Sequence, residues 1–189
     1  MYRKKISLIL VVFFWGMAQG CWAQFSVGGE LGVALPFGSL SNLVNTGFGG
    51  QGHASYYLNK NFSLGLGVGY YTFSGNEQTN SFEQYKANIT PIVVKANYYF
   101  SQADFQPFVG LDAGFYRLAS RFQVANTTQV LGESYWGLSP SVGLLVDTSH
   151  HLKLLGNIKY NYIASDIEST DFLTIHLGAI YVFSPDKNK

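Results

Sequence analysis

The chain has 189 residues, enough for one domain, and its formal net charge of +1 gives no basic field to attract nucleic acid. Charged residues make up only 12% of it, about half the usual share, whereas Gly (21), Tyr (13) and Phe (15) are abundant. This composition argues against disorder and against a helical bundle, and it suits a β-protein whose outer surface does not face water everywhere.

The first 23 residues have the pattern of a signal peptide. Three cations at positions 3–5 precede an apolar run at 6–16, and Cys21 and Ala23 are the small residues before a cleavage point after Ala23. The run is shorter than the ~20 residues of a spanning helix. A lipoprotein signal with acylated Cys21 is the alternative reading. We therefore expect export and removal of residues 1–23, which leaves nine basic and eleven acidic residues, and no cysteine for a disulfide or zinc site.

Eight segments after the cleavage point alternate between large apolar residues and small or polar ones, which is the period of a strand with two different faces. The segments lie at roughly 25–35, 46–58, 62–71, 87–100, 106–119, 134–147, 152–162 and 173–183. No stretch has a convincing helical period. We predict an all-β fold, an eight-stranded antiparallel up-and-down transmembrane β-barrel over residues 24–183, followed by a polar tail at 184–189.

The connections between these segments alternate in length. Long connections are expected at about 36–45, 75–86 and 120–133, short ones at 59–61, 101–105 and 147–150, and an intermediate one at 165–170. Outer-membrane barrels have short periplasmic turns and longer external loops. We therefore expect both termini on the periplasmic side, and external loops at 75–86 and 120–133 polar enough to meet a partner.

Aromatic residues are expected in two girdles, one at each membrane interface. The periplasmic set is Tyr56, Tyr57, Tyr98, Tyr99, Phe100, Phe105, Phe108, Tyr181 and Phe183, and the external set is Tyr70, Tyr71, Phe73, Phe115, Tyr116, Tyr135, Trp136, Tyr160 and Tyr162. Pro91 and Pro140 fall inside predicted strands and each removes a ladder donor, so we expect a bulge or a local break at each.

The interior of an eight-stranded barrel is just filled by side chains. The polar residues predicted to face this lumen are Glu30, Gln51, His53, Lys95, Asp112, Lys153, Lys159 and His176. They carry both signs of charge, and many glycines leave room for them. A packed, hydrogen-bonded polar core is therefore favoured over an open path for ions.

Several segments resemble a known family. They are the signal end Trp22-Ala23-Gln24, residues 88–95 leading into Tyr98-Tyr99-Phe100, and residues 107–114. The chain resembles, over 24–183, the porin-family or outer-membrane β-barrel-domain proteins of Bacteroidetes, a grouping that includes PorT-like proteins. The resemblance implies a barrel whose last strand ends in an aromatic residue, here Phe183, that the assembly machinery reads. It implies no particular activity, and the family name does not imply a pore.

Catalysis would need a nucleophile, a base and an acid in contact. The candidates are His176 with Ser139 or Ser141, and Asp112 or Glu30. No Gly-x-Ser-x-Gly motif is present. His150 and His151 are adjacent in a turn, which favours solvated residues over a shared metal. We predict no catalytic residue, no cofactor and no metal.

These observations lead to a non-enzymatic barrel in the outer membrane of a Gram-negative bacterium, surrounded by lipid. It would serve envelope integrity or present loops to an extracellular or envelope protein. The alternatives are a narrow passive channel past Lys95, Asp112 and Lys159, a lipid-modifying enzyme, and a soluble barrel that holds a ligand. The last would need a charged outer face, which the alternation does not provide.

Overall fold

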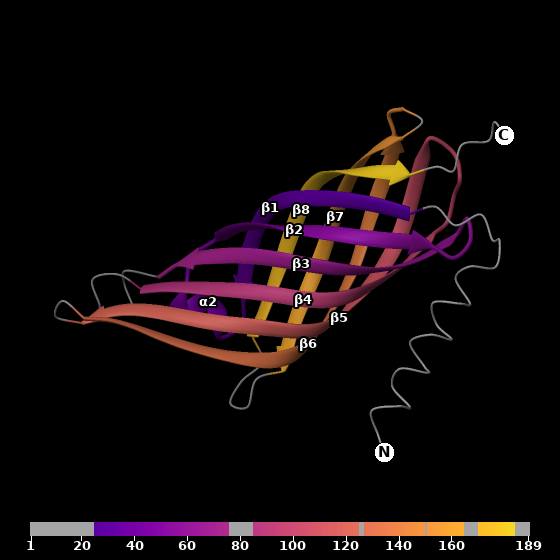
Figure 1. The fold of residues 1–189 in the computed structure, drawn as a ribbon. Coiled ribbons are helices and arrows are strands. Elements are labelled where there is room, and N and C mark those ends of the chain that lie inside the picture. The colour runs from indigo at the N-terminus through magenta and orange to yellow at the C-terminus, as the bar shows by residue number, and fades with distance from the viewer. Residues whose placement is uncertain (1–24, 76–84, 125–126, 150, 165–169, 184–189) are drawn as a thin grey trace, which may run out of the picture.

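A computed structural model describes residues 25–75, 85–124, 127–149, 151–164 and 170–183. Eight strands form a closed barrel in which each pairs antiparallel with its sequence neighbours and the last pairs with the first (Figure 1). They are β1 (Phe25–Phe37), β2 (Gly47–Tyr57), β3 (Phe62–Ser74), β4 (Tyr85–Tyr99), β5 (Phe105–Val124), β6 (Thr127–Asp147), β7 (Leu152–Ala164) and β8 (Thr170–Phe183). The predicted eight-stranded up-and-down barrel is confirmed. The predicted signal peptide and polar tail lie outside the described residues.

The barrel has two ends. The terminal end carries Phe25 and Phe183, which are register partners, and the connections 58–61, 100–104 and 148–151. The loop end is the opposite one, with the connection 38–46 and the described ends of β3, β5 and β7. Figure 1 shows the start of β1 and the end of β8 beside each other at the terminal end.

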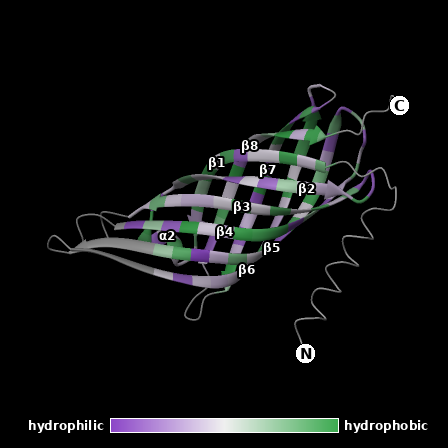
Figure 2. Cartoon of the chain, in the orientation of Figure 1, coloured by the Kyte–Doolittle hydropathy of each residue, from purple (hydrophilic) through white to green (hydrophobic). Residues whose placement is uncertain are grey.

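The outer face of the barrel is apolar on every strand. Large exposed apolar side chains include Leu31, Phe48, Leu66, Ile92, Phe115, Val142, Leu154 and Leu177. Leu31 and Leu177 are each 74% exposed and pair across the β1–β8 seam. Figure 2 shows hydrophobic and more polar residues mixed along each strand, as expected when the two faces differ. A continuous apolar surface of this extent is disfavoured in water and suits a lipid environment.

The connection between β1 and β2 contains one helical turn, α2 (Leu40–Leu43), where the sequence predicted only a loop. A single turn is too short to produce a helical period in the sequence. The turn is followed by Val44, which is 1% exposed and forms a bridge to Gly75. This connection therefore folds over the loop end of the lumen.

The predicted loop at 120–133 is wrong. Strands β5 and β6 continue in unbroken register from Phe105–Val146 to Val124–Thr127. The segment contains four β-branched residues and one aromatic residue and has no proline, so pairing within the hairpin outweighs its polar character. The pairing of β6 with β7 stops at Trp136–Ala164. Beyond that pair, the β5–β6 hairpin projects past the rim (Figure 1).

The expectation of a break at each strand proline is confirmed. Pairing between β3 and β4 is interrupted beside Pro91, and pairing between β6 and β7 beside Pro140. Val68 pairs with Ile92 and Tyr71 with Ile89, so the interrupted part contains the same number of residues on β3 as on β4. These are therefore breaks without an inserted residue, and not bulges.

The aromatic girdles form only in part, because adjacent residues of a strand face opposite sides. The outward members are Tyr98, Phe100, Phe105, Tyr181 and Phe183 at the terminal end, and Tyr70, Phe115, Trp136, Tyr160 and Tyr162 at the loop end. The predicted girdle residues Tyr99 and Phe108, and Tyr71, Phe73 and Tyr116, are instead buried inside the barrel. Tyr57 and Tyr135 also face inward and pack against the interior clusters, so the prediction is wrong for these seven.

Candidate functional site

Four charged side chains from four strands meet in the middle of the lumen. They are Glu30 on β1, Lys95 on β4, Asp112 on β5 and Lys159 on β7, each at most 5% exposed. Asp112 Oδ2 lies 2.7 Å from Lys159 Nζ and 3.3 Å from Lys95 Nζ. Glu30 Oε1 lies 3.6 Å from Lys159 Nζ and 3.8 Å from Lys95 Nζ. Two carboxylates and two ammonium groups thus neutralise one another, and we call them the charged layer.

Neutral polar groups form hydrogen bonds with the charged layer, and among the described residues Glu30 Oε1 and Asp112 Oδ1 accept none. Lys159 Nζ donates to Gln51 Oε1 at 2.8 Å, and Asn157 Nδ2 donates to Glu30 Oε2 at 2.5 Å. The Asn157 amide oxygen is 3.2 Å from His176 Nδ1, and His176 Nε2 is 3.1 Å from the Tyr71 hydroxyl. Burial of a charge is tolerable only when it is paired and hydrogen-bonded. The network therefore holds strands that are not neighbours in the sheet.

The strand register explains how the charged layer assembles. Lys95 and Asp112 are direct partners across β4 and β5, and Glu30 and Gln51 are direct partners across β1 and β2. Glu30 faces Gly178 on β8, where a Cβ atom would lie 2.9 Å from the Glu30 Cβ. That approach is too close for an unshifted side chain, so glycine at 178 leaves the space that Glu30 occupies.

Apolar clusters lie inside the barrel on both sides of the charged layer. The loop-end cluster is Ala34, Val44, Tyr71, Phe73, Ala87, Ile89, Val93, Tyr116, Ile163 and Phe172, with Leu40 of α2 packed against it. The terminal-end cluster is Tyr99, Phe108, Leu145, Leu155, Ile180 and Val182. Rings pack against each other in both, with centroids 5.6 Å apart for Phe73 and Phe172 and for Tyr99 and Phe108. The lumen is thus filled in three layers, with the polar one in the middle.

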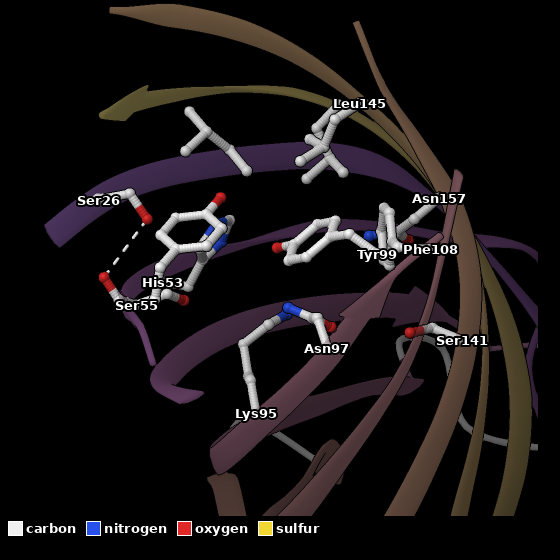
Figure 3. A pocket seen from close by; sticks show the side chains of 13 residues that line it. Ser26, His53, Ser55, Lys95, Asn97, Tyr99, Phe108, Ser141, Leu145 and Asn157 are labelled. Carbon is white, nitrogen blue, oxygen red and sulfur yellow. Dashed lines mark hydrogen bonds between the residues drawn. The ribbon is translucent and has the colours of Figure 1, made fainter. Parts of the chain in front are cut away.

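A small cavity of about 20 Å³ lies between the charged layer and the terminal-end cluster (Figure 3). Its lining includes His53, Lys95, Asn97, Tyr99 and Phe108. A cavity needs ~10–15 Å³ to hold one water molecule, so this one holds about one. In the described part of the chain His53 Nδ1 has no hydrogen-bond partner, and a water molecule here would supply one.

Lys153 lies apart from the other predicted lumen residues. Its Nζ is 3.0 Å from Asp147 Oδ1 and donates to Gln106 Oε1 at 3.1 Å, near the terminal end of β7. The Lys153 and Asp147 side chains are 18% and 33% exposed. This pair is therefore a half-solvated rim interaction.

The described side chains do not bring His176 into hydrogen-bond contact with Ser139 or Ser141, as a catalytic triad would require. The partners of His176 are Asn157 and Tyr71, and neither is a nucleophile beside an acid. Ser139 donates to Asn161 Oδ1 at 2.9 Å and contacts the Tyr116 hydroxyl. Ser141 lines the small cavity, and the cavity lining does not include His176. Within the described ranges no three His, Cys, Asp or Glu residues are grouped as metal ligands, and no helix is long and apolar enough to cross a membrane.

Several buried polar residues were not among the predicted lumen residues. In the described chain they include Gln106, Asn157, Asn161 and Thr174. Asn157 and Asn161 share the strand face of Lys159, so the alternation contained the signal that would have found them. The charge of Lys159 marked it as a lumen residue, whereas the uncharged amides of Asn157 and Asn161 did not distinguish them from polar residues of loops.

A closed, eight-stranded antiparallel barrel with an apolar exterior and a polar interior defines the outer-membrane β-barrel class. Residues 6–183 match the family model described as the outer membrane protein beta-barrel domain, so the chain belongs to that family and is a small outer-membrane barrel. A search of curated proteins found no match.

Solved outer-membrane barrels share this fold. Neisserial surface protein A is 18% identical, with 86% of this chain and 98% of that chain covered and a TM-score of 0.58. A major outer membrane protein from Thermus thermophilus is 15% identical, with 85% of this chain and 99% of that chain covered, and has a TM-score of 0.65. OprG from Pseudomonas aeruginosa is 13% identical, with 86% of this chain and 97% of that chain covered, and has a TM-score of 0.58. At these identities the likeness concerns the fold.

Proposed function

We propose that this protein is a closed, non-conducting barrel that serves the outer membrane by its structure and by the segments it presents at the loop end, without catalysis. The observation that carries the proposal is the three-layered filling of the lumen. The charged layer is fully buried and internally neutralised, and an apolar cluster closes it off on each side. An interior of this kind suits a scaffold.

A passive channel would need water past Lys95, Asp112 and Lys159. These three are in direct contact, with Asp112 Oδ2 between the two ammonium groups. An ion moving along this path would have to separate them and cross the apolar clusters without a hydration shell, which is strongly unfavourable. The filling thus favours the scaffold over the channel.

The proposed topology has the terminal end in the periplasm and the loop end outside the cell. Its support is the even number of strands and the short connections at the terminal end, as is usual in bacterial outer-membrane barrels. Residues 1–23 would be removed on export, and the finer family assignment would be the PorT-like grouping of Bacteroidetes. The projecting β5–β6 hairpin is then the segment best placed to meet an extracellular or envelope protein.

Conductance in planar lipid bilayers tests the proposal. We expect the refolded chain from Gln24 onward to give no current steps above the lipid baseline. A known porin in the same membrane is the positive control. A faster-running unboiled band on a detergent gel must first establish that the sample is folded. Discrete current steps from the folded protein would replace the scaffold with a channel, and altered envelope lipids in a deletion strain would restore the enzyme alternative.

A further inference from the structure

The apolar outer face of the barrel is interrupted by polar residues on one side of the loop end. They are Thr72 on β3, Lys86, Asn88 and Thr90 on β4, Arg117 on β5 and Ser134 on β6, which we call the rim patch. Thr90 pairs with Arg117 and Arg117 pairs with Ser134, so three polar side chains form one row across adjacent strands. A row of this kind is unusual on a face that is otherwise apolar.

The rim patch lies just beyond the outward aromatic residues. Phe115 and Trp136 are register partners with ring centroids 5.4 Å apart, and they are 61% and 50% exposed. Arg117 and Ser134 each follow one of them by two residues toward the loop end. Two residues of a strand tilted by ~40° rise ~5 Å. Outward aromatic rings mark the headgroup level, so the polar row lies at the depth of lipid headgroups.

The two cations of the rim patch are available to a ligand. Among the residues that the structure describes, no carboxylate forms an ion pair with Lys86 or Arg117, and both side chains are exposed. The Arg117 side chain lies over Gly132, where a Cβ atom would be 3.6 Å from its Nε and from a terminal guanidinium nitrogen. The guanidinium thus lies along the outer face of the β5–β6 hairpin, and does not turn inward.

The opposite side of the barrel lacks these features. At the loop end, β7 and β1 present the aromatic residues Tyr160, Tyr162 and Phe37 outward. The charged outward residue described there is Asp171 on β8, which carries the opposite sign. On the β3–β6 side the exposed Glu133 of β6 offsets one of the two cations, so the described charge there is net positive, whereas at β8 it is negative. An anionic ligand in the surrounding leaflet is therefore drawn to the β3–β6 side of the barrel.

We propose that the rim patch binds a phosphate-bearing glycolipid headgroup, of the lipid A type, in the outer leaflet. Arg117 and Lys86 bind the phosphates, because guanidinium and ammonium groups make charge-assisted hydrogen bonds to phosphate oxygens. Asn88, Thr90 and Ser134 are placed to bind sugar hydroxyls. The acyl chains lie along the apolar strand faces below, near Phe115 and Ile92. A patch at headgroup depth beside an apolar wall suits a lipid better than a soluble glycan. The inference rests on the topology proposed above.

Native mass spectrometry of the folded barrel in detergent, with lipid added, tests this site. The probes are diphosphoryl lipid A, its dephosphorylated form, and phosphatidylglycerol. The test variant is Lys86→Ala with Arg117→Ala, and the matched control is Lys60→Ala with Lys153→Ala, which removes the same charge at the terminal end. Wild type and control should bind diphosphoryl lipid A at least about tenfold more tightly than the other two lipids, and the test variant should lose that preference.

Equal binding of lipid A by the test variant and wild type would overturn the site. Equal affinity for phosphatidylglycerol and lipid A would mean general attraction to anionic lipid, and would also overturn it. The gel shift establishes that every variant is folded. Conductance and topology are measured separately, with surface labelling of a Lys86→Cys variant in whole cells. Conductance would reject the scaffold and leave the binding result standing, while absence of labelling from outside would reject the topology and the outer-leaflet assignment with it.

Discussion

Lys153 and Lys159 lie on the same face of the same strand, yet their surroundings differ greatly. Lys159 is 2% exposed and contacts Asp112, Glu30 and Gln51 in the middle of the lumen. Lys153 is paired with Asp147 at a half-solvated rim. An ion pair near water contributes little because water and salt screen it, whereas loss of one buried partner leaves a carboxylate without compensation.

Replacement of each lysine by methionine should show how much more the buried ion pairs of Lys159 contribute to stability than the half-solvated pair of Lys153. Lys159→Met should lower the free energy of unfolding by about 3–5 kcal/mol, and Lys153→Met by about 0–1 kcal/mol. Urea titration of the barrel in lipid vesicles, followed by the gel shift, measures both. Equal losses would mean that the charged layer is hydrated and contributes no more than a surface pair.

The alternation of residue types along the chain identified which polar side chains face inward, but it could not identify their contacts. Lys95 and Asp112 are partners within one hairpin, so a known register would have predicted that pair. Glu30 and Lys159 are far apart in the sequence, on strands β1 and β7 that are brought together only by closure of the barrel through β8. Contacts across a lumen depend on strand stagger, which sequence periodicity does not encode.

Among the elements, the β5–β6 hairpin departs most from what the sequence predicted. The predicted loop at 120–133 was inferred from polar composition, but cross-strand pairing within a hairpin needs no apolar face. The predicted positions of the eight strands were otherwise close, because four segments alternate strongly and the other four alternate with less contrast but over a similar length. The short helix α2 has too few residues to produce a periodic signal.

Shortening the β5–β6 hairpin should leave the barrel intact. Removal of residues 120–124 together with 127–131 deletes whole register pairs, from Ser120–Leu131 to Val124–Thr127. The deleted part of β6 lies beyond the last pair that β6 makes with β7, and the deleted part of β5 makes three pairs with β4, from Ala87–Ser120 to Tyr85–Phe122. We expect the unfolding free energy to change by less than about 1 kcal/mol, measured by the same urea titration. Loss of the gel shift would show that the hairpin is required for folding. The matched control removes only 127–131, which leaves 120–126 as a loop between the retained pair Ala119–Gly132, and it should keep the gel shift as well.

For the molecule as a whole, the distribution of apolar side chains specifies which face of the sheet meets lipid. The exterior is apolar on all eight strands, and the interior holds the polar network. A water-soluble protein has the opposite arrangement, with polar residues outside, so the apolar exterior is what suits this barrel to a membrane. The sequence pattern predicted this inversion from low charge and alternation alone.

Tryptophan fluorescence can measure which face meets lipid, because Trp136 is the one tryptophan after residue 23. It is outward and 50% exposed near the loop end. We expect lipids labelled near the headgroup to quench it more strongly than lipids labelled deep in the chain. The matched control carries Trp136→Phe with Phe108→Trp, which moves the indole to a buried position inside the barrel. Strong quenching of that control, or none of the wild type, would contradict the assigned faces.

The origin of the charged layer on β1, β4, β5 and β7 has a consequence for assembly. In an open sheet, Glu30 and Lys159 cannot meet, because the thirteen register pairs of β1 with β8 have not formed. The β1–β2 hairpin entering hydrocarbon alone would carry Glu30 without a counterion, which is strongly disfavoured. A slip of one residue at the closing seam would turn Glu30 toward lipid. Closure in the native register is therefore favoured electrostatically, because that register brings both carboxylates within 4 Å of both ammonium groups.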